Sequence, residues 1–130
     1  MDWKMMRARK LLFPLILFAI SCGSDGGTTT SPSPPVAGTM VTITPSGVDP
    51  RNLQIRPGTQ VTFVNNDVRN HDMASNPHPE HTDCPELNQV GVIVPGQRKQ
   101  SGNLNLVRTC GYHDHDDAQN TRWQGLITIQ

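Results

Sequence analysis

The sequence has few aromatic residues and no sustained helical pattern. Only 5% of its 130 residues are aromatic, whereas glycine and proline occur 11 times each. Glycine and proline are the poorest helix formers, and no segment repeats apolar residues with the 3.6-residue period of an amphipathic helix. These absences exclude a helical bundle. We expect instead one small, turn-rich, mainly β domain.

The chain also lacks a basic patch and the usual catalytic motifs. Its formal net charge is zero, but residues 1–22 hold four of the 11 basic residues and one of the 11 acidic ones, which leaves 7 basic and 10 acidic residues in 23–130. This acidic balance argues against a nucleic acid partner. No Ser/His/Asp order, paired carboxylates in an apolar setting or phosphate-binding glycine loop is present, so we expect no enzyme.

The main apolar run lies near the N-terminus, over residues 11–20. As a helix it would rise about 15 Å, which is too short to cross the ~30 Å of a bilayer core. Basic residues precede the run and the small residue Ser21 ends it, as in an export signal over residues 1–21. The segment 19–23 resembles the bacterial lipobox, although Ala19 stands where leucine is usual. The resemblance implies a lipid on Cys22; the alternative is an ordinary secretory signal.

Residues 22–38 predict a flexible tether that starts at the lipidated cysteine. They are rich in glycine, serine, threonine and proline and have almost nothing to bury. A lipid followed by such a spacer would hold an exported domain at a membrane of the cell envelope, facing the periplasm. In a Gram-negative host, Gly23 is compatible with the outer membrane.

Residues 39–130 predict an all-β domain, either a Greek-key β-sandwich or a barrel. Strands are expected at 40–44, 52–55, 60–64, 90–94 and 125–129, with one more near Leu104 and Leu106. The first two alternate apolar and polar residues, and 60–64 is rich in β-branched residues. Residues 66–89 are expected to form a long loop, and loops of that length are usually functional or disordered.

The cysteine and histidine pattern points to a metal. Cys110 and His113 are three residues apart in a stretch that we expect to be a loop between the last two strands, and His71 lies in the long upstream loop. A thiolate with imidazole nitrogens is a donor set typical of copper.

These segments resemble the cupredoxins. The similarity covers about residues 40–130 and rests on the run from Pro57 to Phe63, the strand ending 64–67 and the Cys-x-x-His motif. It implies a cupredoxin-like Greek-key sandwich with copper near one end, held by His71, Cys110 and His113. It also implies one-electron transfer to a redox protein of the cell envelope.

The sequence departs from that family at the fourth copper ligand. Cupredoxins usually place an axial methionine before the last strand, but this chain has no methionine after Met73. Trp123 falls in that position when aligned from the last strand, and Asp116 or Ala118 when aligned from Cys110. Trp123 or Ala118 would leave copper three-coordinate, whereas His115 or Asp116 would make a tighter site for Cu(II).

A disulfide is the main competing interpretation. Once Cys22 is lipidated, Cys84 and Cys110 remain in an oxidising compartment, where two cysteines are ordinarily bonded. That bond would leave a metal-free binding module. Copper binding or delivery without electron transfer is a third alternative. His78, His81 and Cys84, spaced by three, would form a second metal site or join the first. Solvated loop histidines are the competing interpretation, because the intervening prolines oppose a helix.

Overall fold

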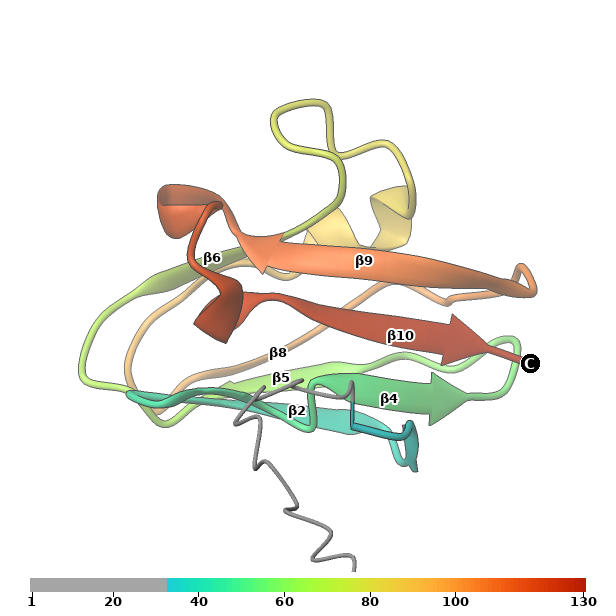
Figure 1. Cartoon of the computed structure of the whole chain (residues 1–130), viewed down its shortest axis with the longest axis horizontal. Coiled ribbons are helices and arrows are strands. Elements are labelled where there is room, and N and C mark those ends of the chain that lie inside the picture. The colour runs from blue at the N-terminus through green and yellow to red at the C-terminus, as the bar shows by residue number, and fades with distance from the viewer. Residues whose placement is uncertain (1–32) are drawn as a thin grey trace, which may run out of the picture. The chain divides into compact units, whose positions relative to one another are not determined.

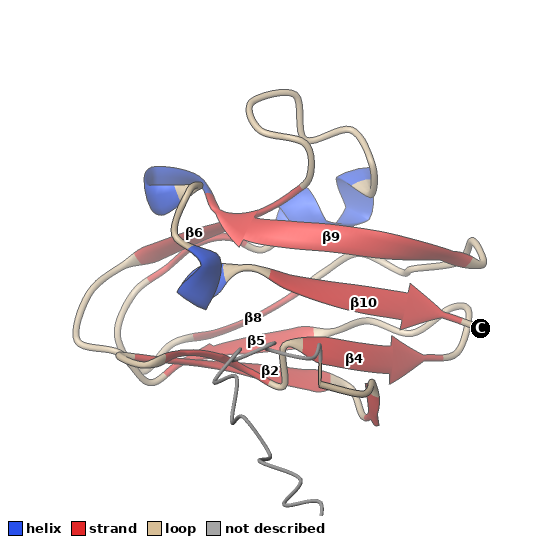
Figure 2. Cartoon of the chain, viewed as in Figure 1, coloured by secondary structure: helices blue, strands red, loops and turns tan. Residues whose placement is uncertain are grey.

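A computed structural model describes residues 33–130 as two packed β-sheets (Figures 1 and 2). Both sheets mix parallel and antiparallel pairs, and no α-helix occurs among these residues. In spatial order, sheet A contains β1 (Val36–Ala37), β4 (Asn52–Ile55), β10 (Gly125–Ile129), β9 (Arg108–Asp114), β6 (His71–Ser75) and β7 (Gly91–Ile93). Sheet B contains β3 (Gly47–Asp49), β2 (Met40–Thr44), β5 (Thr62–Asn65) and β8 (Arg98–Gln100). Three short 3-10 helices complete the described part: η1 (Pro85–Gln89), η2 (His115–Asp117) and η3 (Thr121–Trp123).

The core lies between the two sheets and follows the period of two expected of strands. In β2 and β4, every second residue is buried, and β10 adds Ile127 and Ile129. Phe63 of β5 and Tyr112 of β9 meet edge to face across the core, with ring centroids 5.2 Å apart. This alternation is what the sequence pattern predicted, and the all-β sandwich is confirmed.

Several segments differ from the sequence-based expectation. The strand expected near Leu104 and Leu106 is not formed, because Leu104 makes only an isolated bridge to Thr59. β3 and β8 were not expected. β6 lies within the stretch 66–89 that was expected to be loop, and β9 contains the Cys110–Asp114 stretch that was expected to connect two strands. β1 lies within the predicted tether and pairs in parallel with β4. In β6 the inward positions include His71 and Ser75, so burial does not follow hydrophobicity there.

The export signal 1–21, the lipid on Cys22 and the tether up to residue 32 fall outside the described residues. Within residues 33–130, no helix is long and apolar enough to cross a membrane. The membrane anchor therefore stays a prediction from the sequence.

Candidate metal centre

The site is organised by β9, whose residues alternate between the two faces of sheet A. Tyr112 and Asp114 lie directly opposite Ser75 and Met73 of β6, whereas His113 lies opposite Ala74. Side chains at paired positions share a face and successive residues point to opposite faces. Odd-numbered residues of β6 therefore share the inner face with the even-numbered residues of β9. His113 points to the outer face.

On the inner face, Cys110 is bonded to Cys84. The two residues have Cα atoms 5.8 Å apart, are 26 positions apart in sequence and are fully buried. A sulfur in a disulfide is not a thiolate, so Cys110 cannot act as the predicted copper ligand in this structure. The prediction for Cys110 is corrected accordingly, and the alternative Cys84–Cys110 pairing is the arrangement found.

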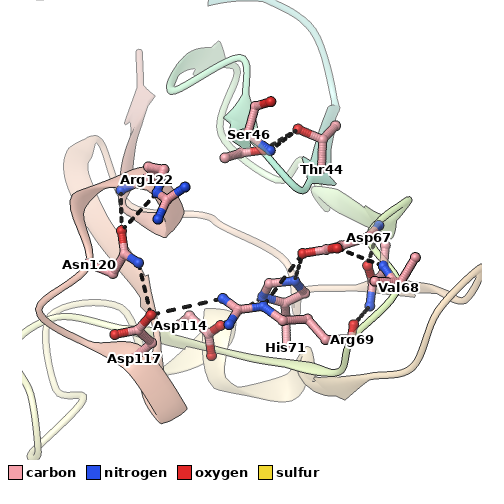
Figure 3. Close-up of polar contacts among 12 residues, drawn as sticks. Thr44, Ser46, Asp67, Val68, Arg69, His71, Asp114, Asp117, Asn120 and Arg122 are labelled. Carbon is pink, nitrogen blue, oxygen red and sulfur yellow. Dashed lines mark hydrogen bonds and ion pairs between the residues drawn. The ribbon is translucent and has the colours of Figure 1, made fainter.

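His71 also lies on the inner face, between two carboxylates (Figure 3). Its Nδ1 is 2.7 Å from Oδ2 of Asp114 and its Nε2 is 3.1 Å from Oδ2 of Asp67, while the ring is fully buried. Both ring nitrogens are therefore engaged with carboxylates. Because His71 and His113 project from opposite faces, the structure does not bring the predicted His71, Cys110 and His113 set together.

Asp67 and Asp114 have further partners that fix this inner group. Burial alone would raise the pKa of Asp67, but hydrogen bonds from the Val68 N–H and from His71, with the positive charges of His71 and Arg69, lower it. Oδ1 of Asp114 accepts from the backbone N–H groups of Asp72 and Asp116, at 3.1 and 3.2 Å. Asp114 therefore joins β6 to η2, the short helix that begins with His115.

Two other predicted axial ligands have different surroundings. Trp123 is buried, with its ring centroid 5.4 Å from that of His71 and with the Arg69 guanidinium 3.9 Å above it. Asp116 is exposed in η2, where its backbone is capped by Asp114. Neither belongs to the group of potential metal ligands that the described residues form.

That group consists of four histidines on the outer face. One ring nitrogen from each lies within 4.8 Å of those of the other three. In five of the six ring pairs the centroids are 4.9 to 5.6 Å apart. Nδ1 of His115 is 3.2 Å from Nε2 of His81. We call this the four-histidine cluster; its members are His78, His81, His113 and His115. The sequence named all four, but it placed only His113 in the principal site and favoured solvated loop positions for His78 and His81.

The loop after β6 supplies two of the four rings. Figure 1 shows this loop, drawn in yellow-green, projecting from the sheets at the top of the view. It is closed by a hydrogen bond from the Asp83 N–H to the Asn76 carbonyl, 2.8 Å long. His81 has φ +52°, a left-handed conformation that is uncommon for a residue other than glycine. Its N–H donates to Pro77 and its carbonyl accepts from the side chain of Asn88, which holds that conformation.

β9 and η2 supply the other two rings of the four-histidine cluster. His113 is only 2% exposed, and its Nδ1 lies 2.7 Å from Oδ1 of Asn76. His115 is exposed and begins η2, where the Asp114 side chain caps the helix by accepting from the N–H of Asp116. His113 lies on the outer face of β9, and His115, at the start of η2, joins it in the cluster.

Two rings of the cluster, His81 and His113, favour the uncharged form. Burial lowers the pKa of His113, and the charges of His81, His78 and His115 lower it further. The pKa of His81 is also lowered, by burial and then by His115 and His78. Neutral imidazole is the form that binds metals.

One atom of the cluster lacks the partner that a buried polar group needs. Nε2 of His113 is buried and has no hydrogen-bond partner among the described residues. A buried nitrogen of this kind normally finds a donor, an acceptor or a metal. An imidazole nitrogen binds a metal such as zinc at about 2.0–2.1 Å, so the four nitrogens would have to draw together around a bound ion. Four imidazoles fit copper, which accepts nitrogen donors readily.

Comparisons with known proteins identify the fold. No family model and no curated protein matches the chain. Among solved structures, the purple cupredoxin from Nitrosopumilus maritimus is 20% identical, with a TM-score of 0.53 over 72% of this chain and 100% of that one. Plastocyanin from Dryopteris crassirhizoma is 12% identical, with a TM-score of 0.54 over 70% and 99%. An oxidized mutant of amicyanin is 17% identical, with a TM-score of 0.56 over 78% and 95%.

Proposed function

Starting from a cupredoxin-like fold, we propose that this chain is an exported copper-binding protein whose metal site is the four-histidine cluster. The observation that carries the proposal is the unpartnered, buried Nε2 of His113, with a ring nitrogen of three other histidines within 4.8 Å. The proposal keeps the predicted cofactor and one predicted ligand, His113. It replaces His71 and Cys110 with three imidazoles from the outer face.

The donor set favours the oxidised metal. Sulfur donors stabilise Cu(I), whereas imidazole nitrogens also suit Cu(II), which prefers planar nitrogen coordination. When bound, copper would supply a Lewis acid that can take up or release one electron. Burial and the neighbouring rings favour the neutral form of His81 and His113. The disulfide fixes strand β9 close to the loop that carries His78 and His81. We therefore favour copper binding and delivery within the cell envelope.

One-electron transfer is the second candidate function, and the rigidity of the site favours it. His113 sits on a strand held by the disulfide, and the loop of His78 and His81 is closed at its base. A site that rearranges little can exchange electrons quickly. Reversible voltammetry of the copper-loaded protein separates the two functions: fast exchange supports transfer to a redox protein, and a slow, irreversible wave supports binding and delivery.

Membrane attachment through Cys22 is a separate part of the proposal, and it rests on the lipobox resemblance. A lipid there would hold the domain at the membrane, with the tether 22–38 as spacer. In the native host, we expect the protein in the membrane fraction and expect the Cys22→Ala variant to leave it. Equal distribution of both forms between the membrane and soluble fractions would contradict the anchor.

The copper proposal is tested by titrating the purified mature chain with Cu(II) under air. We expect one copper per chain, electron paramagnetic resonance with couplings from several nitrogens, and only weak visible absorption. The control is thiol titration with peptide mapping, which should find Cys84 and Cys110 linked. No copper uptake would overturn the proposal. An intense thiolate-to-copper band would instead restore Cys110 as a ligand.

A further inference from the structure

Asn76 is the residue next to the four-histidine cluster whose polar groups the proposed function does not use. It follows β6 and begins the loop that carries His78 and His81. Its Oδ1 lies 2.7 Å from Nδ1 of His113. An amide oxygen can only accept a hydrogen bond, so Nδ1 of His113 must carry the proton. In the neutral ring, the lone pair then lies on Nε2, the buried nitrogen without a partner.

The carboxamide of Asn76 is held in place by the strand beneath it. The Asn76 N–H donates to the carbonyl of Gly111 at 3.0 Å. A Cβ atom added at Gly111 would collide with Nδ2 of Asn76 and come within 2.9 Å of its Cγ. Real Cβ atoms do not approach other atoms so closely, so the carboxamide occupies the space that any other residue at 111 would fill. Gly111 and His113 are two positions apart and lie on the same outer face of β9.

We propose that Asn76, seated on Gly111, is a positioning residue that fixes His113 as the Nδ1–H tautomer and so makes Nε2 its metal-binding atom. The proposal rests on the proposed function for the identity of the metal. A histidine ligand commonly donates its second N–H to an oxygen, which fixes the ring and makes it a better donor. Losing such a partner typically weakens metal binding about 10- to 100-fold.

The tautomer can be measured without any metal. In the metal-free mature chain, ¹H–¹⁵N correlation spectra of the imidazoles should show His113 with a protonated Nδ1 and a bare Nε2. In Asn76→Leu, which keeps similar bulk but has no acceptor, we expect His113 to shift toward the Nε2–H form. Asn76→Asp keeps an oxygen at the same place and should retain the wild-type tautomer. Gly111→Ala should displace the carboxamide and reproduce the Leu variant without changing either polar group.

Copper affinity provides the second measurement. We expect about a 10- to 100-fold loss for Asn76→Leu and Gly111→Ala, and recovery in Asn76→Asp. The matched control is Asn88→Leu: its side chain bonds the His81 carbonyl and the Ser75 N–H but not a histidine ring. That variant loosens the same loop but keeps the Asn76 oxygen beside His113. It should therefore leave the His113 tautomer unchanged, whatever it does to copper affinity.

The outcomes separate this inference from the proposed function. If His113 keeps its tautomer in both Asn76→Leu and Gly111→Ala, the positioning role is wrong even when the wild type binds copper. If the tautomer changes as expected but the wild type takes up no copper, the positioning role stands and the choice of metal fails. Should Asn76→Leu not fold, Gly111→Ala and Asn76→Asp decide the matter, because they must then give opposite tautomers.

Discussion

The two faces of sheet A use the same strand for different purposes. On the inner face, β9 contributes a disulfide sulfur from Cys110 and a carboxylate from Asp114, both buried and both bonded to distant parts of the chain. On the outer face it contributes His113, whose free nitrogen faces three other imidazoles. Two residues three positions apart in a strand lie on opposite faces. A Cys-x-x-His motif can therefore form one metal site in a loop, but it is divided between two environments when it lies within a strand.

If the proposed function holds, we expect the inner face to stabilise the fold and the outer face to bind the metal. Inner substitutions, apart from those at the disulfide that ties β9 to the histidine-bearing loop, should destabilise the fold and leave copper affinity nearly unchanged. Outer substitutions should do the reverse. A variant that moves both quantities together would contradict the division.

The largest effect is expected from removing two exposed ligands together, in His78→Ala/His115→Ala. Zinc at four-ligand protein sites contributes ~10–16 kcal/mol, or about 3 kcal/mol per ligand, and about 1.4 kcal/mol corresponds to a factor of ten. Copper affinity should therefore fall about ten-thousandfold in competition titrations. The metal-free protein should keep its stability within about 0.5 kcal/mol, as surface variants usually do. Unchanged copper affinity would show that the four-histidine cluster is not the copper site.

The next effect concerns the inner histidine, in His71→Leu. This change leaves the carboxylates of Asp67 and Asp114 without their shared partner, although their side chains are only 4% and 1% exposed. Leaving a buried polar group without its hydrogen-bond partner costs about 1–3 kcal/mol, and more for a charged group, so the two carboxylates together should lower the unfolding free energy by about 4 kcal/mol. Urea unfolding measures this loss. Copper affinity of the folded variant should change less than about threefold, and a loss as large as that of His78→Ala/His115→Ala would mean that His71 is a ligand after all.

Removing the disulfide should lower the unfolding free energy slightly less than His71→Leu does. The bond closes a loop of 26 residues, for which the chain-entropy estimate is about 3.5 kcal/mol. We expect that loss for Cys84→Ala/Cys110→Ala in thermal or urea unfolding, and nearly the same loss for each single variant. If Cys110→Ser abolished a coloured copper site while Cys84→Ser kept it, the two cysteines would not act as a pair.

The smallest effect is the pH dependence of the metal-free protein. Because the folded-state pKa of His113 is lowered, the unfolded chain binds more protons between the ordinary value near about 6.5 and the folded value. The unfolding free energy should therefore fall as the pH drops through that window and level off below it. His113→Gln should reduce this slope. If the pH dependence of the unfolding free energy is unchanged in this variant, it arises from other groups.

The pattern of apolar residues was enough to predict five of the ten strands in the described part of the sandwich, β2, β4, β5, β7 and β10. It did not predict β6 and β9, the strands that carry His71 and His113. β2, β4 and β10 have apolar inward positions, so their pattern identifies them. β6 places His71 and Ser75 inward, and their burial depends on partners that come from other segments. A single-sequence pattern contains no information about those partners.

The sequence predicted only part of the candidate site, because it could not show which residues meet in space. His113 was identified as a potential ligand and lies in the four-histidine cluster, but the assumption of a free thiolate at Cys110 led to the wrong companions. The spacing of Cys84 and Cys110 cannot by itself distinguish a disulfide from a metal ligand. Had the disulfide been assumed, it would have brought His78 and His81, a few residues before Cys84, close to His113, three residues after Cys110.

The disulfide has a further consequence for a protein that carries oxidised copper. Cupric ions attack unprotected thiols, oxidising the sulfur while the metal drops to the cuprous state. Cys84 and Cys110 are the only cysteines in residues 33–130, and each is already bonded to the other. The described domain therefore offers no thiol to oxidise, and a cupric ion bound at the proposed site would be held without damage to the protein.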